Sequence, residues 1–465
     1  MTFHMVDYLI KNGLIVTLDS QRRIIKDGAI AIEGNKILDV GKTEEIKKKY
    51  KAEQEIDAKE KVVLPGFVDA HTHVSAEQLV RGFVPDDAGP MSWIYDWIVH
   101  IYAAATEEDE YFSSLHSFIE CIKTGTTTIC DGGTIHSLPS TIRAMSDTGI
   151  RGVVGKWVWD IPDKPARMAQ STSEALKSND EAVRLYDKSL NGRVRVWPML
   201  IGVYPFTCTD ELLIGSKKIA DKYGLGLSLH QSLDQEEVDE SIKKTGKRPI
   251  EHFEDLGILD KNLRLVHMIY VNDREIDLLR KFDVKVAHCP TTALRLAYGA
   301  TKAGKFPEMI ERGICVSLGC DGTNSSNHVD MGRAIYLAAG LYKDCRTDIN
   351  MIPAETALEM GTINGARSVL MENEIGSIEK GKKADIILFD RRRPEWVPLF
   401  NVINTLVYTA DGKSVDTVFI DGKIVLEEGK MVGFSEHEVY AKVQELGENM
   451  ISRTGLPLRT RWKTI

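Results

Sequence analysis

Two histidines separated by one residue stand at the end of an apolar run. His71 and His73 follow the run 62–64, which Pro65 and Gly66 interrupt, a pattern typical of a buried strand and its exit. Side chains two residues apart in an extended segment project to the same side, and the spacing puts these about 6–7 Å apart along the chain. Such a pair is half of a metal site. Two core histidines with structural hydrogen bonds are the alternative.

Beyond this motif, apolar runs alternate with amphipathic stretches, which is the pattern of a parallel sheet with crossover helices. Eight strand–helix units favour a closed (β/α)8 barrel, in which chemistry gathers at the carboxyl ends of the strands. The eight strand candidates are residues 62–71, 126–131, 152–159, 194–202, 224–230, 263–268, 284–290 and 315–322.

Further polar residues occupy these strand ends. His230 ends the fifth candidate, His267 and His288 lie in the sixth and seventh, and Asp321 ends the eighth. Imidazoles and a carboxylate suit a divalent ion such as zinc, which lowers the pKa of bound water to about 7. We expect Asp321 to transfer the proton and His267 to orient water or substrate. His288 either contacts the substrate or braces its own loop.

The bulk composition excludes several classes of function. The 465 residues are 43% hydrophobic and 27% charged, with a formal net charge of −9, which is typical of a globular protein. The negative balance gives no reason to bind nucleic acid or an anionic membrane, and no apolar run reaches membrane-spanning length. Seven cysteines without disulfide-type spacing indicate reduced thiols and a cytoplasmic location.

Short alternating strands return at both ends of the chain, with turn dipeptides such as Asn12-Gly13 and Asp421-Gly422 between them. We therefore predict that residues 1–61 and 371–435 together form one small β-sandwich domain. Residues 62–370 form the barrel inserted between them, and 436–465 form a final helix and tail.

The ordered motifs resemble the amidohydrolase superfamily, in the branch that holds cytosine-, guanine- and adenosyl-type deaminases and triazine chlorohydrolases. The resemblance implies an α/β fold, a distorted (β/α)8 TIM barrel with a composite β-domain, and a homo-oligomer. The stretches that carry it are residues 64–73, 79–82, 125–128, 229–230, 287–290, 318–322 and 376–385.

The resemblance also implies a ligand set and a cofactor. The implied cofactor is one divalent metal per chain, zinc first, with iron or cobalt as alternatives. Some members hold two metals bridged by a lysine on strand 4, but residues 194–200 contain none. Asp321 and His267 are the implied catalytic residues, and the implied metal ligands are His71, His73, His230 and Asp321.

Departures from the family pattern concern the substrate. Leu233 stands where ring-deaminating members carry a glutamate, three residues after the strand-5 histidine, and a leucine moves no proton. Tyr102 and Tyr204 stand where adenosine-type members hold the sugar with a carboxylate and a histidine. A site that lacks matching polar partners discriminates strongly against such a substrate. Trp93 and Trp97 belong to an aromatic stretch that forms either a pocket wall or ordinary helix packing.

The leading hypothesis is a metal-dependent hydrolase of carbon–nitrogen, non-peptide bonds in a small, fairly apolar amide-, urea- or carbamate-like substrate. In this respect the chain is similar to phenylurea and thiocarbamate hydrolases. The alternative is an aminohydrolase or chlorohydrolase of an N-heterocycle such as a triazine, pyrimidine or purine, with Asp234, Glu236 or Glu237 replacing Leu233. A non-catalytic scaffold is a minor alternative, disfavoured by the complete ligand set. The expected partner is a small molecule, without nucleic acid or membrane.

Overall fold

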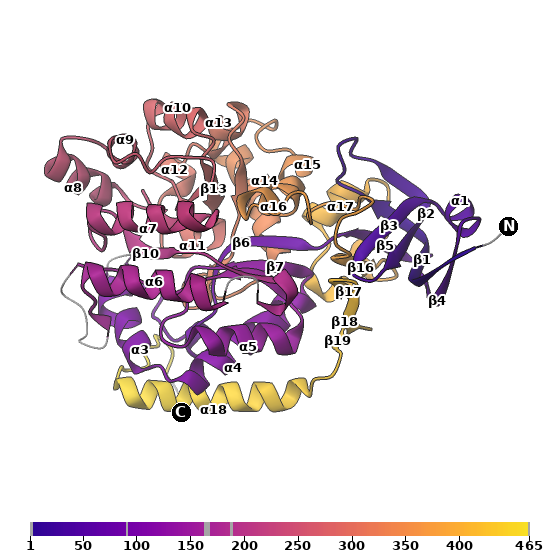
Figure 1. The fold of residues 1–465 in the computed structure, drawn as a ribbon, viewed down its shortest axis with the longest axis horizontal. Helices are drawn as coiled ribbons and strands as arrows, with labels where there is room; N and C mark the ends of the chain where they lie inside the picture. Colours follow the sequence, from indigo (N-terminus) through magenta and orange to yellow (C-terminus); the bar gives the residue numbers. More distant parts are fainter. Residues whose placement is uncertain (1–2, 90–91, 162–167, 187–188, 464–465) are drawn as a thin grey trace.

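Two strand systems organise the molecule, a barrel and, beside it, a sheet built from both ends of the chain (Figure 1). The computed structural model describes residues 3–89, 92–161, 168–186 and 189–463. The barrel is formed by parallel strands in chain order, and helices surround it. The predicted barrel with a composite β-domain is therefore confirmed.

The barrel consists of two half-sheets, because its fourth and eighth strands are each broken in two. The fourth breaks at Trp197-Pro198, where proline has no N–H to continue the ladder, and its two parts pair with different neighbours. One half-sheet has the order β15-β6-β7-β8-β9 and the other β10-β11-β12-β13-β14. The strands are β6 (Phe67–His73), β7 (Thr126–Asp131), β8 (Arg151–Val154), β9 (Val194–Val196), β10 (Met199–Val203), β11 (Leu227–Gln231), β12 (Leu263–His267), β13 (Lys285–His288), β14 (Val316–Leu318) and β15 (Asp321–Gly322).

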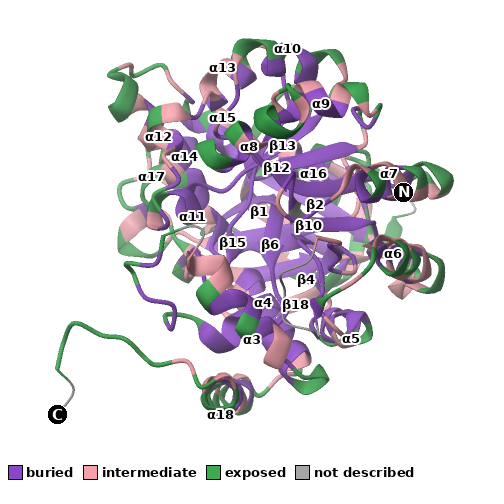
Figure 2. Ribbon diagram, turned by 90° about the vertical axis from the view of Figure 1, so that its left-hand side faces the viewer, coloured by how far each residue is buried: buried purple, intermediate pink, exposed green. Residues whose placement is uncertain are grey.

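Helices cover the outside of the barrel, so its strands are buried on both faces, as parallel sheets require; Figure 2 shows them in the interior of the molecule. Helix starts follow capping rules: Thr106 and Asp109 form a capping box before α4, and Asn272 and Glu275 form one before α10. The helices are α4 (Glu107–Lys123), α5 (Leu138–Thr148), α6 (Thr172–Tyr186), α7 (Asp210–Tyr223), α8 (Gln235–Thr245), α9 (Pro249–Asp255), α10 (Asp273–Lys281), α11 (Pro290–Arg295), α12 (Ala300–Ala303), α13 (Phe306–Glu311), α14 (Met331–Arg346), α15 (Ala354–Met360) and α16 (Ile363–Ser368).

The terminal sheet has nine strands, and the two chain ends meet where β5 pairs antiparallel with β16. The expected single strand 62–71 is thus two strands, one in each system. Gly66 lies between them, and only glycine fits there because a Cβ would lie 2.0 Å from Thr127 Oγ1. The domain boundaries at 61, 370 and 435 stay a prediction. The strands are β1 (His4–Val16), β2 (Ile24–Glu33), β3 (Lys36–Lys42), β4 (Tyr50–Asp57), β5 (Lys61–Pro65), β16 (Ile386–Asp390), β17 (Val415–Ile420), β18 (Lys423–Glu427) and β19 (Lys430–Met431), with helices α1 (Thr43–Lys47) and α17 (Val402–Tyr408).

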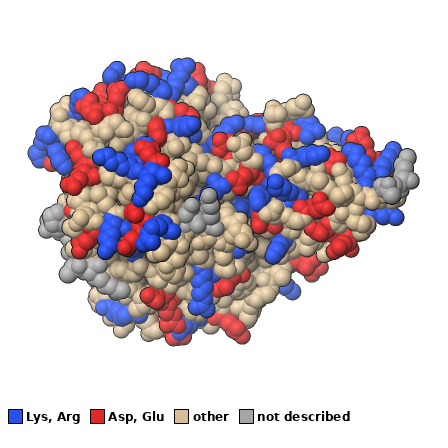
Figure 3. Space-filling model, viewed as in Figure 1, with Lys and Arg blue, Asp and Glu red and all other residues tan. Residues whose placement is uncertain are grey.

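A buried ion cluster joins the two systems. Arg151, at the start of β8, donates to both oxygens of Asp385 at 2.6 and 3.0 Å and to Asp421 at 2.9 Å. The final helix, α18 (Glu436–Thr454), packs along α4, α3 (Val99–Ala104) and the 3₁₀ turn η1 (Glu77–Val80). Charges of both signs are interspersed on the face shown in Figure 3. Among the described residues, no helix is long and apolar enough to cross a membrane.

Candidate metal centre and its pocket

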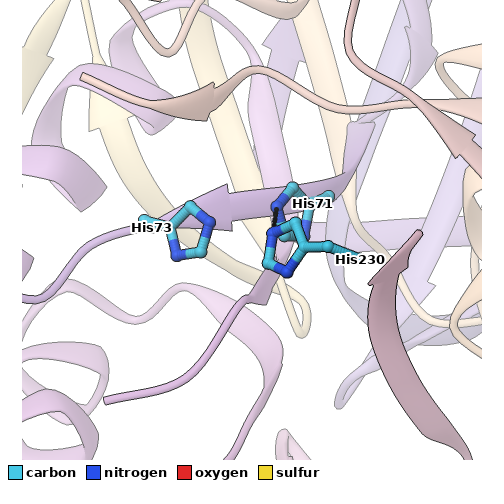
Figure 4. Close-up of side chains that lie close together, drawn as sticks. All are labelled: His71, His73 and His230. Carbon is cyan, nitrogen blue, oxygen red and sulfur yellow. Dashed lines mark hydrogen bonds between the residues drawn. The ribbon is translucent and has the colours of Figure 1, made fainter. Parts of the chain in front are cut away.

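Three histidines converge at the mouth of the barrel (Figure 4). His71 and His73 leave β6 on the same side, and His230 comes from β11 in the other half-sheet. The Nε2 atoms of His71 and His230 are 3.0 Å apart, and the ring centroids of His71 and His73 are 4.7 Å apart. All three are buried, and their ligand atoms lie within 4.8 Å of one another. The strand spacing therefore does produce the convergence predicted from the sequence.

Asp321 and His267 complete this cluster. Asp321 Oδ1 lies 3.6 Å from His71 Nε2 and 3.4 Å from His73 Nε2, while Oδ2 lies 4.0 Å from His267 Nε2. His267 and Asp321 have φ of +73° and +62°, a region that residues other than glycine seldom adopt. Strained backbone of this kind clusters at functional sites. Here it occurs at the last residue of β12 and at the first residue of β15.

The protonation states suit a cation. Burial holds the pKa of His71, His73 and His267 well below the usual range, so these imidazoles are neutral. Burial alone would raise the pKa of Asp321, but the positive charge of a neighbouring imidazole such as His267 when protonated, and the N–H of Gly322, hold it below its usual value, which favours the carboxylate. Neutral imidazoles and an ionised carboxylate are the forms that bind a metal.

Unused polar atoms also fit a metal. The Nδ1 atoms of His71, His73 and His267 have no hydrogen-bond partner among the described residues, so no protein contact fixes which ring nitrogen carries the proton. The thiol of Cys289 lies with His267 and Asp321, but burial raises its pKa well above the usual range, so it is a poor ligand. The donor set fits one divalent ion, which when bound would act as a Lewis acid and activate water.

Neighbouring residues hold the cluster in place. A Cβ on Gly132 would lie 2.3 Å from His73 Cε1, so only glycine leaves room for the imidazole. Asp69 accepts from the backbone N–H groups of His71 and Cys320, both at 3.1 Å. Burial raises the pKa of Asp69 to about 7. These contacts hold β6 against the eighth strand, and so position the three proposed ligands His71, His73 and Asp321.

A narrow apolar cavity opens onto the cluster. It encloses about 70 Å³ and is walled by aromatic and aliphatic side chains that include Trp93, Trp157 and Leu233. Typical ligand pockets enclose roughly 300–1,000 Å³, so this one suits a small molecule. Trp93 begins a π-helical segment, η2 (Trp93–Ile98), and such segments are frequent at functional sites. A larger hollow of about 700 Å³ lies against the terminal sheet and contains no histidine.

Only some of the residues predicted to bind substrate line the cavity in the structure. Trp93, Tyr102 and Leu233 line the cavity, as does His267. His288 does not: its ring stacks on Phe306 with centroids 3.8 Å apart. Trp97 does not either, because it packs edge-on against Phe83 at 5.6 Å. Both are buried in the core, so their positions do not support the predicted substrate contact.

No replacement for the missing glutamate lines the described cavity wall. The side chain of Asp234 caps α8 by accepting from Glu237 N–H at 3.0 Å. Glu237 in turn accepts from the N–H of Leu233 at 3.1 Å, so its carboxyl supports the loop from behind. Glu236 is exposed. Asp321 is the one carboxylate on the described wall.

Sequence reasoning missed several site residues. Tyr298 lines the cavity, with its ring 5.7 Å from that of His267. Glu77 hydrogen-bonds the hydroxyl of Tyr102 just behind the wall. A lone acid within the otherwise uncharged stretch 74–80 was a usable signal for Glu77. No comparable signal in the sequence marks Tyr298 or Cys289.

The fold and the donor set define a barrel hydrolase of the metal-dependent class. Residues 62–425 match the model of the Amidohydrolase family, and the chain belongs to that family. It is a metal-dependent amidohydrolase that acts on carbon–nitrogen bonds, which confirms the predicted enzyme class and the deaminase and triazine-hydrolase branch.

Similar proteins carry adenosine-type names. A 5-methylthioadenosine/S-adenosylhomocysteine deaminase of Thermoanaerobacter pseudethanolicus is 33% identical over 96% of this chain and 100% of its own. A 5'-deoxyadenosine deaminase of Methanosarcina mazei is 32% identical over 97% and 99%. A crystal structure of an adenosine deaminase from Xanthomonas campestris with bound zinc superposes with a TM-score of 0.90 at 26% identity, covering 97% of this chain and all of that one. These names favour the N-heterocycle alternative over the leading amide or urea hypothesis.

Proposed function

We propose that this protein removes an amino group by hydrolysis from a small N-heterocycle. The observation that carries the proposal is the aromatic cavity closing directly over His73, His230, His267 and Asp321. A planar ring held between Trp93 and Trp157 would present an exocyclic carbon–nitrogen bond to these polar groups. The names of the relatives support the same chemistry.

Each residue then has a role. His71, His73, His230 and Asp321 would hold one divalent metal, for which zinc is the proposal because a similar adenosine deaminase contains it. Asp321 accepts the proton of the attacking water and delivers it to the leaving nitrogen. His267, whose Nε2 lies 4.0 Å from Asp321 Oδ2, orients the water or the substrate.

The substrate we propose is smaller than the nucleosides named for the relatives. The cavity of about 70 Å³ is well below the roughly 300–1,000 Å³ of typical ligand pockets, which favours a substrate without a sugar. Tyr204, at a predicted sugar-binding position, stacks on His252 with centroids 5.1 Å apart and does not line the cavity. A free aminated ring fits these observations better than a nucleoside does.

Hydrolysis of an acyclic amide, urea or carbamate is the second candidate. Leu233 favours it, because such substrates need no proton delivered to a ring nitrogen. The wall also offers no second carboxylate among the described residues.

Ammonia release from a substrate panel, with metal analysis, tests the proposal. The panel holds aminotriazines, aminopyrimidines, aminopurines, 5-methylthioadenosine, phenylureas and carbamates, and the Asp321→Asn variant controls for contaminating activity. About one metal per chain with ammonia from a free ring is the expected result. Turnover confined to acyclic compounds would transfer the assignment to the second candidate, and turnover of the nucleoside alone would contradict the proposed size limit.

A further inference from the structure

The hollow of about 700 Å³ against the terminal sheet is a second concave surface, separate from the metal centre. It is lined by residues of the terminal sheet and of the helices α15 and α17. Apolar side chains from these elements, among them Val16, Leu358 and Ile403, form much of its lining. None of the residues that line it also lines the cavity at the metal centre. The hollow therefore needs an explanation of its own.

Phe400 lies on the rim of this hollow as an exposed aromatic ring. Its side chain is 93% exposed, and Ile24, which also lines the hollow, is 46% exposed. Phe400 stands directly before Asn401, the N-cap of α17. An apolar residue at this position often packs onto the fourth residue of its own helix, but that residue is the polar Thr405. An exposed ring beside an apolar hollow indicates a surface that another molecule covers.

The charges around the hollow differ from those of the chain as a whole. The chain has 68 acidic and 59 basic residues, whereas four bases and three acids line the hollow. Two of these bases and one of these acids already belong to ion pairs. The other four have no ion pair among the described residues: Lys26, Lys59, Asp27 and Glu355.

This balance suits contact with an identical surface. Two chains of net charge −9 repel each other through most of their surface, but a face with two unpaired lysines and two unpaired acids carries no such excess. When the face meets a copy of itself, the lysines of each copy can pair with the acids of the other. A partner of one strong charge, in contrast, would leave half of these groups unmatched.

We propose that this face is the contact between two copies of the chain, and that the ring of Phe400 in each copy enters the hollow of the other. A projecting ring and a hollow that adjoin on one face are self-complementary, as an interface around a twofold axis requires. An aromatic side chain seated in a pocket is also a typical anchor of an interface. Each copy keeps its own metal centre, because the hollow shares no lining residue with that cavity.

Sedimentation velocity of the full-length protein, across a wide range of concentrations, tests the contact. The wild type should form a dimer, and Phe400→Asp should raise its dissociation constant at least ~10-fold, because the change removes the anchor and places a charge in an apolar hollow. Trp462→Asp is the matched control: this ring is 88% exposed and does not line the hollow, so the dimer should persist. Because both rings are exposed, urea unfolding should be unchanged in either variant.

A disulfide between two different chains tests the position of the ring. One chain carries Phe400→Cys and the other Ile24→Cys, both in a Cys345→Ser background, because Cys345 is the exposed thiol among the cysteines. Air oxidation of the mixture should give the mixed disulfide in preference to either symmetric one, as mass spectrometry of the non-reduced protein would show. Trp462→Cys mixed with Ile24→Cys should give no such product.

Each result decides for or against the contact, whatever the substrate of the enzyme is. A wild type that is monomeric at all concentrations overturns the inference, as does a dimer that Phe400→Asp leaves intact. A dimer lost in Trp462→Asp but not in Phe400→Asp would assign the contact to the C-terminal tail. Symmetric Phe400→Cys disulfides alone would mean that the two rings meet each other, and this too contradicts insertion into the hollow.

Discussion

Two buried polar clusters lie at opposite ends of the barrel strands and differ in how completely they are paired. At the start of β8, Arg151 is matched by Asp385 and Asp421. At the carboxyl ends, the described atoms without hydrogen-bond partners include Nδ1 of His71 and His73 and an oxygen of Glu77. Buried polar groups in proteins are normally satisfied, so the contrast separates a cluster that holds the fold from one arranged for a ligand.

The largest effect on activity is expected from a change in the histidine cluster at the mouth of the barrel. His73→Ala should lower kcat/KM by at least ~10³-fold and reduce bound metal, because it removes one proposed ligand from the set. The free energy of unfolding of the metal-free protein should change little. Elemental analysis and steady-state kinetics measure the first two quantities, and urea unfolding after chelation the third. Retained metal and activity would contradict the contrast between the clusters.

At the cluster of Arg151, Asp385 and Asp421, which joins the barrel to the terminal sheet, we expect a loss of stability with little loss of activity. Arg151→Met leaves Asp385 buried without its cation, and breaking a buried pair in this way costs about 3–5 kcal/mol. Urea unfolding should show this loss, whereas kcat per metal-loaded, folded molecule should stay within about twofold of wild type. A fall in kcat at full metal loading would show that the Arg151 cluster also affects catalysis at the metal centre.

Leu233→Glu should sharpen the contrast by adding a carboxyl to the cavity wall. Leu233 is buried in this wall, so the change costs about 1–3 kcal/mol of stability. It should raise ammonia release from an aminotriazine or aminopurine about 10-fold, since a positioned acid can protonate a ring nitrogen. Leu233→Gln is the control of similar shape. Equal rates in both variants would mean that the absence of an acid at this position does not limit ring deamination.

A smaller, pH-dependent effect is expected at Asp131 on β7. Burial raises its pKa to about 7 from an ordinary value near 4. The folded state therefore holds a proton that the unfolded state has lost, and stability declines as pH rises through this interval. Urea unfolding at pH 5 and pH 8 should show a smaller difference for Asp131→Asn than for wild type. An unaltered difference would assign the pH dependence to other groups.

Strand periodicity and strand order explain how the proposed metal ligands could be named from the sequence, whereas only part of the cavity wall could be. His71 and His73 share one strand, so strand periodicity alone places them together, and the order of strand ends brought in His230 and Asp321. Glu77 and Tyr102 meet only through folding, 25 residues apart, and neither lies at a strand end. Asp234 caps α8, and its position in the sequence near Leu233 does not reveal this local role.

The change of sheet between β5 and β6 was also beyond the sequence pattern. Pro65 and Gly66 interrupt the run 62–71, but the sequence pattern does not show that β5 and β6 join different sheets, nor that Gly66 lies against Thr127. The predicted homo-oligomer and cytoplasmic location remain predictions.

Because the barrel consists of two half-sheets, the proposed metal would also have a structural role. His71, His73 and Asp321 belong to the half-sheet that contains β6, whereas His230 and His267 belong to the other. An ion held by His71, His73 and Asp321 on one side and by His230 on the other would link the two half-sheets, at a point where β6 and β11 share no ladder. Loading and unloading of the ion would then tighten and loosen this seam between the half-sheets, on which the substrate sits.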